Sequence, residues 1–186
     1  MEAAAAKDWI SEENFDQIVR QYQKRVHRVI FLLVRDPDAA DTLTQECFLR
    51  AYQSRASFRG DCQVGTWILR LAVNLAKDHG KNRRVWFWKK LVGLDEDTTG
   101  AAVQRLSSRQ PTPENLLLLR EELGAVWRAI TSLSPQQRAI FLLRFVEDMS
   151  LAEVAQVLEL RVGSVKAQLF RAVRKIRGKI KEEKWR

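Results

Sequence analysis

The sequence predicts an all-α protein with two helical domains, and three features carry this prediction. Apolar residues recur at steps of three and four along most of the 186-residue chain, which is the period of an amphipathic helix. No stretch keeps the two-residue alternation of a half-buried strand. Residues 85–113, with their glycines, prolines, serines and acidic patch, have the composition of a flexible linker. We therefore expect one domain at 12–84 and another at 114–180.

The first domain is expected to contain three helices. Residues 15–33 place apolar side chains on one face of a long helix, which Asp36 and Pro37 end. A second helix follows over about 38–54. The segment 57–65 reads as a turn, and a third helix then carries apolar residues over 67–75 before it reaches a basic end.

The second domain is expected to open at Thr112-Pro113, with proline in the first helical turn. The segments 134–137 (SPQQ) and 150–153 (SLAE) each predict a capping box at a helix start. The second box begins a helix of barely two turns, and after a break at 159–162 a last helix is expected over about 163–176. A short helix, a turn and a longer helix rich in Lys, Gln and Arg form a helix-turn-helix.

The net charge of +9 is concentrated in two short segments. Residues 81–90 carry five basic and no acidic side chains, and residues 161–186 carry ten basic and two acidic ones. This pattern is typical of a protein that binds a polyanion, although a basic cluster can also be a solvated face. Because each cluster adjoins an element suited to reading DNA, the pattern favours nucleic acid.

Composition argues against several other classes. The longest apolar runs fall far short of the roughly 20 residues of a membrane helix, and the start of the chain lacks the pattern of a secretory signal. We therefore expect a soluble, cytoplasmic protein. The two cysteines and two histidines form no metal-ligand spacing, and the carboxylates are not paired in apolar surroundings. No catalytic residue, metal, cofactor or small-molecule substrate is predicted.

In a helix-turn-helix, the first residues of the second helix reach base edges in the major groove. Arg and Lys suit guanine and Gln suits adenine, whereas basic residues further along the helix hold phosphates. The predicted set on this helix is Ser164, Lys166, Gln168, Arg171, Arg174 and Lys175. A plain helical hairpin with a basic outer face is the alternative.

Several motifs occur in a fixed order along the chain. They are 38–52 (DAADTLTQECFLRAY), 58–61 (FRGD), Thr66-Trp67, 72–78 (AVNLAKD), 133–135 (LSP) and 162–166 (VGSVK). With them the chain resembles a bacterial RNA polymerase sigma factor of the extracytoplasmic-function (ECF, group IV) subfamily of the sigma-70 family. The resemblance covers about 15–84 and 114–178. It implies that 12–84 is a sigma-two domain, that 114–180 is a sigma-four domain, and that 85–113 is the linker between them.

The resemblance implies partners and further site residues. Core RNA polymerase, through its beta and beta-prime subunits, would bind the second helix at Asp41, Gln45, Glu46 and Leu49. The first domain would read and open the minus-ten promoter element with Phe58, Arg59, Asp61, Asn74, Lys77, Lys81, Arg83 and Arg84. The predicted set on the last helix would read the minus-thirty-five element, and an anti-sigma factor would control the protein.

Three other functions remain open from the residues alone. One is an enzyme, for which the sequence offers no arrangement of catalytic or metal-binding residues. Another is a helix-turn-helix regulator that binds operator DNA as a dimer without polymerase, and a third is an interaction protein with basic segments for acidic partners. The segment 86–88 (WFW) is expected to pack on the first domain or on an inhibitor rather than to anchor the chain at a membrane.

Overall fold

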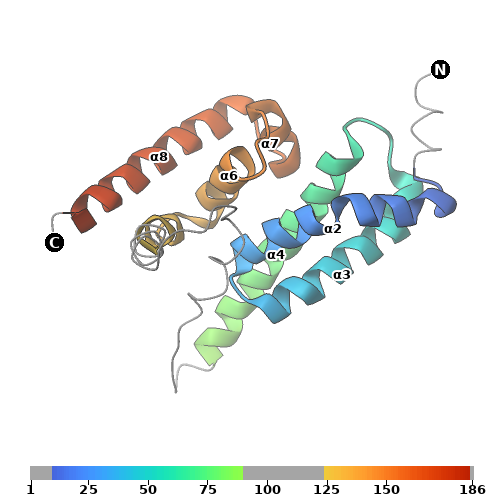
Figure 1. Cartoon of the computed structure of the whole chain (residues 1–186), viewed down its shortest axis with the longest axis horizontal. Helices are drawn as coiled ribbons and strands as arrows, with labels where there is room; N and C mark the ends of the chain where they lie inside the picture. The colour runs from blue at the N-terminus through green and yellow to red at the C-terminus, as the bar shows by residue number, and fades with distance from the viewer. Residues whose placement is uncertain (1–9, 90–123, 185–186) are drawn as a thin grey trace, which may run out of the picture.

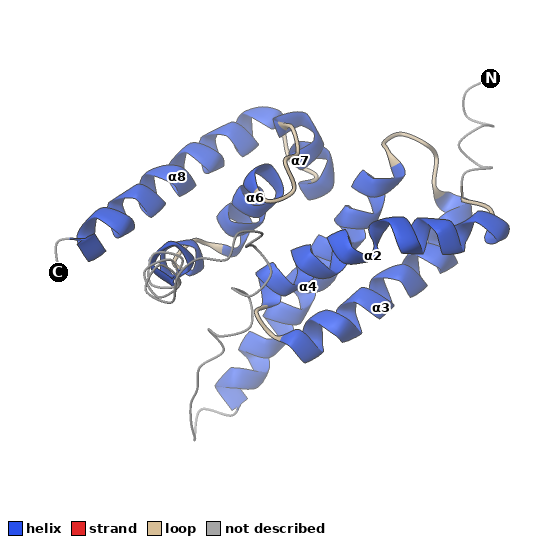
Figure 2. Ribbon diagram, viewed as in Figure 1, coloured by secondary structure: helices blue, strands red, loops and turns tan. Residues whose placement is uncertain are grey.

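The computed structural model of the chain describes residues 10–89 and 124–184, without the side chains of 82–89 and 183–184. All regular structure in these ranges is helical, which confirms the predicted fold class (Figure 2). The helices form two groups, one from each side of the undescribed segment (Figure 1). Most of the predicted linker lies outside the described residues, but its first five residues, 85–89, are helical.

The first bundle contains α2 (Glu12–Val34), α3 (Pro37–Ser54), the short 3-10 helix η1 (Arg55–Ser57) and α4 (Val64–Lys89). The predicted break between the first two helices is confirmed. Arg35 ends α2 in the left-handed conformation, with φ of 59°, and its N–H donates to the carbonyl of Phe31. Asp36 then caps α3, because its side chain accepts from the N–H of Ala39 at 3.1 Å, and Pro37 fits the first helical turn.

The helix α4 begins at Val64, inside the segment that the sequence analysis assigned to a turn. Gly65 lies in its first turn, where α4 passes against α2. A Cβ atom at this position would come within 2.7 Å of Cε1 of Tyr22, so the absence of a side chain allows the two helices to approach. Turn-forming residues therefore mark only 58–63 as the connection, and glycine serves here for packing.

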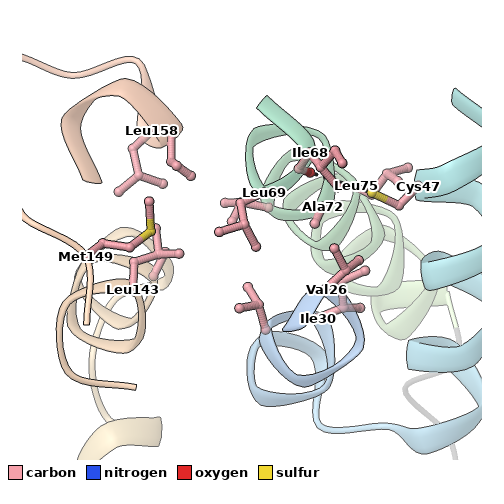
Figure 3. Close-up of a cluster of buried hydrophobic side chains, with 14 of the residues drawn as sticks. Val26, Ile30, Cys47, Ile68, Leu69, Ala72, Leu75, Leu143, Met149 and Leu158 are labelled. Atoms are coloured by element: carbon pink, nitrogen blue, oxygen red, sulfur yellow. Dashed lines mark hydrogen bonds between the residues drawn. The ribbon is translucent and has the colours of Figure 1, made fainter. Parts of the chain in front are cut away.

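The core of the first bundle lies between these three helices. Val26 and Ile30 from α2 meet Cys47 from α3 and Ile68 and Ala72 from α4, and all five are fully buried (Figure 3). The aromatic ring of Trp67 also packs on this core and lies 5.2 Å from the ring of Phe58. The apolar stripes that predicted the helices are thus the surfaces that join them.

The second bundle contains a helical segment at 124–131, then α6 (Pro135–Phe145), α7 (Leu151–Leu158) and α8 (Val162–Lys184). Both predicted capping boxes are present, one at the start of α6 and one at the start of α7. The last helix runs eight residues beyond the predicted end at Ile176. Its apolar stripe continues, because Ile176 is buried and Ile180 packs on the same cluster as 124–131.

The two bundles pack against each other. The helix α7 lies on α4, and α6 lies on α2, so that a single buried cluster runs through both bundles. At the junction, Leu69 of α4 points toward Leu143, Met149 and Leu158 of the second bundle (Figure 3). The sequence analysis made no prediction of this contact.

Candidate nucleic-acid and protein interfaces

The helix-turn-helix is built as the spacing predicted. Ser150 caps α7 by accepting from the N–H of Glu153, and the Glu153 carboxylate accepts from the N–H of Ser150 at 2.8 Å. Hydrogen bonding from the side chain and the backbone N–H of Ser150 to the carboxylate holds the pKa of Glu153 below its usual value. Glu159 turns the chain in the left-handed conformation, with φ of 56°, and Val165 of α8 then packs on the buried face of α7. This packing fixes which face of α8 is left for a partner.

The outward face of α8 carries most of the predicted DNA-reading residues. Ser164, Lys166, Arg171 and Arg174 are exposed, and the two arginines make no ion pair within the described residues. Further along α8, an open hollow is lined by Arg171, Arg174, Lys175, Gly178, Lys179 and Glu182. Such a surface is suited to a strip of phosphates.

Two predicted residues of α8 are already engaged by the protein. Gln168 is half-buried, and its side-chain oxygen accepts from the amide of Gln137 in α6 at 3.2 Å. Lys175 donates to the carbonyl of Ser132, at the end of the helical segment 124–131. Both contacts hold α8 on the rest of its bundle, so these side chains serve packing as well as any partner.

Phe170 was missed by the sequence analysis. It is 69% exposed on α8, one turn from Lys166 on one side and one turn from Arg174 on the other. An aromatic residue in a helix is normally assigned to the core, and the sequence analysis gave Phe170 no role. Its basic neighbours at four residues in each direction were the signal that it lies outside. A large apolar side chain there could contact a thymine methyl group.

In the first bundle, the connection before α4 contains three predicted minus-ten residues. Arg59 and Asp61 are exposed, whereas Phe58 is half-buried against the ring of Trp67. Gly60 allows the tight turn, with φ of 78°. The connection therefore offers two charged side chains and the edge of an aromatic pair.

The predicted residues on α4 differ in their surroundings. Asn74 is exposed, and Lys81 is exposed with its ammonium 3.3 Å from the Asp78 carboxylate. Lys77 is half-buried, and this burial lowers its pKa, while the nearby Glu159 of the second bundle acts in the opposite direction. The side chains of Arg83 and Arg84, like the segment 86–88, lie outside the described side chains.

The predicted polymerase-binding residues share the outer side of α3, away from its buried Cys47. Leu49 is 52% exposed, and Asp41 and Gln45 are exposed. The carboxylate of Asp41 lies 3.0 Å from His27 of α2, and that of Glu46 accepts from Arg50 at 2.7 Å. An exposed leucine among charged side chains has the character of a protein-docking surface.

Within residues 10–89 and 124–184, no helix is both long enough and apolar enough to cross a membrane. The same ranges hold no group of three or more His, Cys, Asp or Glu side chains arranged for a metal ion.

Two family models match the chain, one on each bundle. The model described as Sigma-70 region 2 matches residues 18–85, and the model described as Sigma-70, region 4 matches residues 123–176. The two matched ranges thus belong to separate regions of one family, and each lies mainly within one bundle.

Curated relatives match along nearly the whole chain. The ECF RNA polymerase sigma-E factor of Escherichia coli (strain K12) is 33% identical over 172 residues, which cover 91% of this chain and 87% of the relative. The RNA polymerase sigma-H factor of Pseudomonas aeruginosa is 31% identical over 165 residues, covering 85% of this chain and 81% of the relative.

Solved structures share the fold. The sigma factor RpoE of Bartonella quintana, solved in complex with the anti-sigma factor NepR, has a TM-score of 0.72 at 17% identity and covers 91% of this chain and 98% of its own. CnrH, solved in complex with the cytosolic domain of CnrY, has a TM-score of 0.63 at 20% identity and covers 95% of this chain and 92% of its own.

Proposed function

Because the chain belongs to the ECF family of RNA polymerase sigma factors, we propose that its two bundles divide promoter recognition between them. As a sigma factor it binds core RNA polymerase and directs initiation at specific promoters. The observation that carries the division of labour is that one chain joins a basic, outward-facing recognition helix to a separate bundle with its own exposed loop. A dimeric operator-binding regulator is not favoured, because the match extends through both bundles.

The first bundle would capture the opened minus-ten element. Arg59 and Asp61 stand exposed on the loop before α4, and a base that leaves the duplex can hydrogen-bond to such groups and stack on a flat side chain. Asn74 would line the same site from α4, with Lys77, Lys81, Arg83 and Arg84 holding the backbone. Binding of unstacked bases then supplies the free energy of strand opening, so no nucleotide hydrolysis is needed for melting.

The second bundle would read the minus-thirty-five element. Ser164 and Lys166 lie at the start of α8, where a recognition helix meets base edges, and Arg171 and Arg174 continue the exposed face toward the phosphates. Phe170 joins this set through its exposure. Gln168 would have to exchange its bond with Gln137 for a bond with a base.

The outer side of α3 would dock on core polymerase. Leu49 offers the apolar anchor, and Asp41, Gln45 and Glu46 surround it with polar groups that fix orientation. We also propose that an anti-sigma factor controls the protein, because two structures of the same fold were solved with such a partner or with a partner's cytosolic domain. The chain would act in the cytoplasm, as a binding factor without catalysis of its own.

The decisive experiment combines the purified chain with core RNA polymerase of the native host on a library of genomic fragments. We expect transcripts from discrete start sites, and permanganate-reactive thymines around those sites in the absence of nucleotides. Promoter-independent transcription at the level of core enzyme alone would refute the proposal.

Variants separate the two surfaces. Lys166→Ala and Arg171→Ala should each weaken binding at the upstream element by about 1–3 kcal/mol while leaving affinity for core unchanged. Leu49→Asp should do the reverse. Arg20→Ala, which removes an exposed cation from α2, is the matched control and should alter neither. Equal loss of core affinity in the two α8 variants would contradict the assignment of α8 to DNA.

A further inference from the structure

The contact between the bundles contains a buried carboxylate. Glu147 follows α6 in the second bundle, and its side chain is only 1% exposed. Its two oxygens are divided between two arginines of the first bundle. Oε2 accepts from Nε of Arg25 at 2.6 Å, and Oε1 accepts from Nε of Arg28 at 2.8 Å. Arg25 also reaches the main-chain oxygen of Glu147 at 3.4 Å.

Because Glu147 belongs to one bundle and the two arginines to the other, these ion pairs form only while the bundles are in contact. Arg25 and Arg28 are one turn apart on α2, and their side chains keep 33% and 54% of their exposure. Glu147 has no such access to water while the bundles are in contact, so its charge depends on the two guanidinium groups. If the bundles separate, all three groups regain solvent, and no buried charge is left unpaired.

Other contacts lie beside this cluster. Leu69 of α4 meets the apolar side chains of α6, α7 and the turn between them, and Arg70 approaches the Glu159 carboxylate at 3.5 Å (Figure 3). On the opposite flank, the guanidinium of Arg35 stacks 4.9 Å from the ring centroid of Trp127. Charged and aromatic contacts thus surround an apolar centre, as in a specific interface.

We propose that Glu147, held by Arg25 and Arg28, is a latch that closes the chain on itself and keeps it from binding a promoter until it opens. Its consequence for transcription rests on the proposed function, but the closed state does not. Closure covers part of the proposed minus-ten surface, because Lys77 of α4 lies half-buried near Glu159 of the second bundle.

Geometry gives a second reason for inhibition. The two promoter elements are named for positions about 25 base pairs apart, which is ~85 Å along B-form DNA. A compact chain of this length has a radius of gyration of about 16 Å. With the bundles in contact, their DNA-reading surfaces cannot reach both elements, so recognition of the pair requires the latch to open.

The test measures the distance between the bundles in the full-length protein. Spin labels are attached to Lys24→Cys on α2 and Ala152→Cys on α7, in a Cys62→Ser background where Cys47 stays buried. Both positions are exposed, and they adjoin Arg25 and Glu153, which interact across the contact between the bundles. Pulsed electron resonance of the otherwise unchanged chain should give one short distance. A broad distribution dominated by long distances in this protein would overturn the proposal.

Glu147→Gln removes the charge but keeps the shape, and it should shift the population to longer distances. Asp148→Asn is the matched control, because it removes a carboxylate from the next residue, whose side chain is 97% exposed, and asparagine tolerates the same left-handed backbone. It should leave the distance unchanged. The charge swap Glu147→Arg with Arg25→Glu and Arg28→Glu should restore the short distance.

Identical distance distributions in Glu147→Gln and the unchanged chain, with circular dichroism showing both folded, would refute the latch. The functional readout is affinity for a promoter fragment that carries both elements, at limiting protein concentration, which Glu147→Gln should raise by about 5- to 150-fold, because fewer molecules are closed. Failure of the unchanged chain to support promoter-specific transcription would count against the proposed function alone. Unaltered promoter affinity in a variant that does open would refute the inhibitory role of the latch.

Discussion

Ile68 and Leu69 are neighbours on α4 and are both fully buried, yet they face different parts of the molecule. Ile68 lies in the first bundle's own core, where its carbonyl is 3.7 Å from the sulfur of Cys47. Leu69 points to the second bundle (Figure 3). Truncating each residue to alanine removes the same number of carbon atoms from the same helix. The two variants therefore distinguish the stability of one bundle from the contact between bundles.

A buried isoleucine or leucine changed to alanine costs about 2–5 kcal/mol. For Ile68→Ala this loss falls on unfolding of the first bundle and lowers the Tm of a chain of this size by roughly 4–20 °C. Leu69 becomes exposed once the bundles separate, so its truncation acts on their association. A loss of ~2 kcal/mol shifts that equilibrium about 30-fold toward the open chain.

The assay is thermal unfolding by circular dichroism, together with the spin-label distance between α2 and α7. Leu69→Ala should lengthen the distance at 25 °C with the helical signal intact. Ile68→Ala should keep the short distance in the molecules that remain folded and unfold at lower temperature. If Leu69→Ala instead stays closed and loses as much thermal stability as Ile68→Ala, then Leu69 belongs to the core of the first bundle and the reasoning is wrong.

Two further predictions concern single side chains. Burial raises the pKa of the Cys47 thiol to about 12 and also raises that of Cys62, so at pH 8 a thiol reagent should label the half-buried Cys62 slowly and Cys47 only after denaturation. Because the folded pKa of Cys47 exceeds its ordinary value of 9.0, its contribution to stability is complete below pH 9 and is lost between about pH 9 and 12. Rapid labelling of two thiols in the native protein would contradict this prediction. Gly65→Ala should reduce the free energy of unfolding by ~1–3 kcal/mol in urea titrations, since its Cβ would meet the Tyr22 ring, and the same substitution in a Tyr22→Ala background should cost nothing.

Most of the fold was predictable because its signals are local. The capping boxes at 134–137 and 150–153 define helix starts within four residues of sequence, and Asp36 with Pro37 defines another. The sequence predictions were wrong where contacts between residues far apart in the sequence determine the structure. Gly65 was predicted to lie in a turn, but it lies in the first turn of α4, packed against the ring of Tyr22. The helix α8 continues past its predicted end because Ile180 packs on residues more than 40 positions earlier.

The candidate sites divide in the same way. Periodicity alone placed Lys166 and Arg171 on the outer face of α8, and the structure leaves both exposed. It could not foresee that Gln168 is bonded to Gln137, because that contact depends on how α6 crosses α8. The sequence analysis gave Phe170 no role, whereas the structure leaves its side chain exposed on α8 between Lys166 and Arg174.

The contact between the bundles is the feature least accessible to sequence. Glu147 stands in an ordinary polar turn, and its burial depends on Arg25, which precedes it by 122 residues. Leu69 completes an apolar stripe whether it faces its own bundle or the other one. A flexible linker is equally compatible with closed and open chains, so composition does not favour either state. Because few side chains set this equilibrium, substitutions at Glu147 or Leu69 should alter it while both bundles keep their folds.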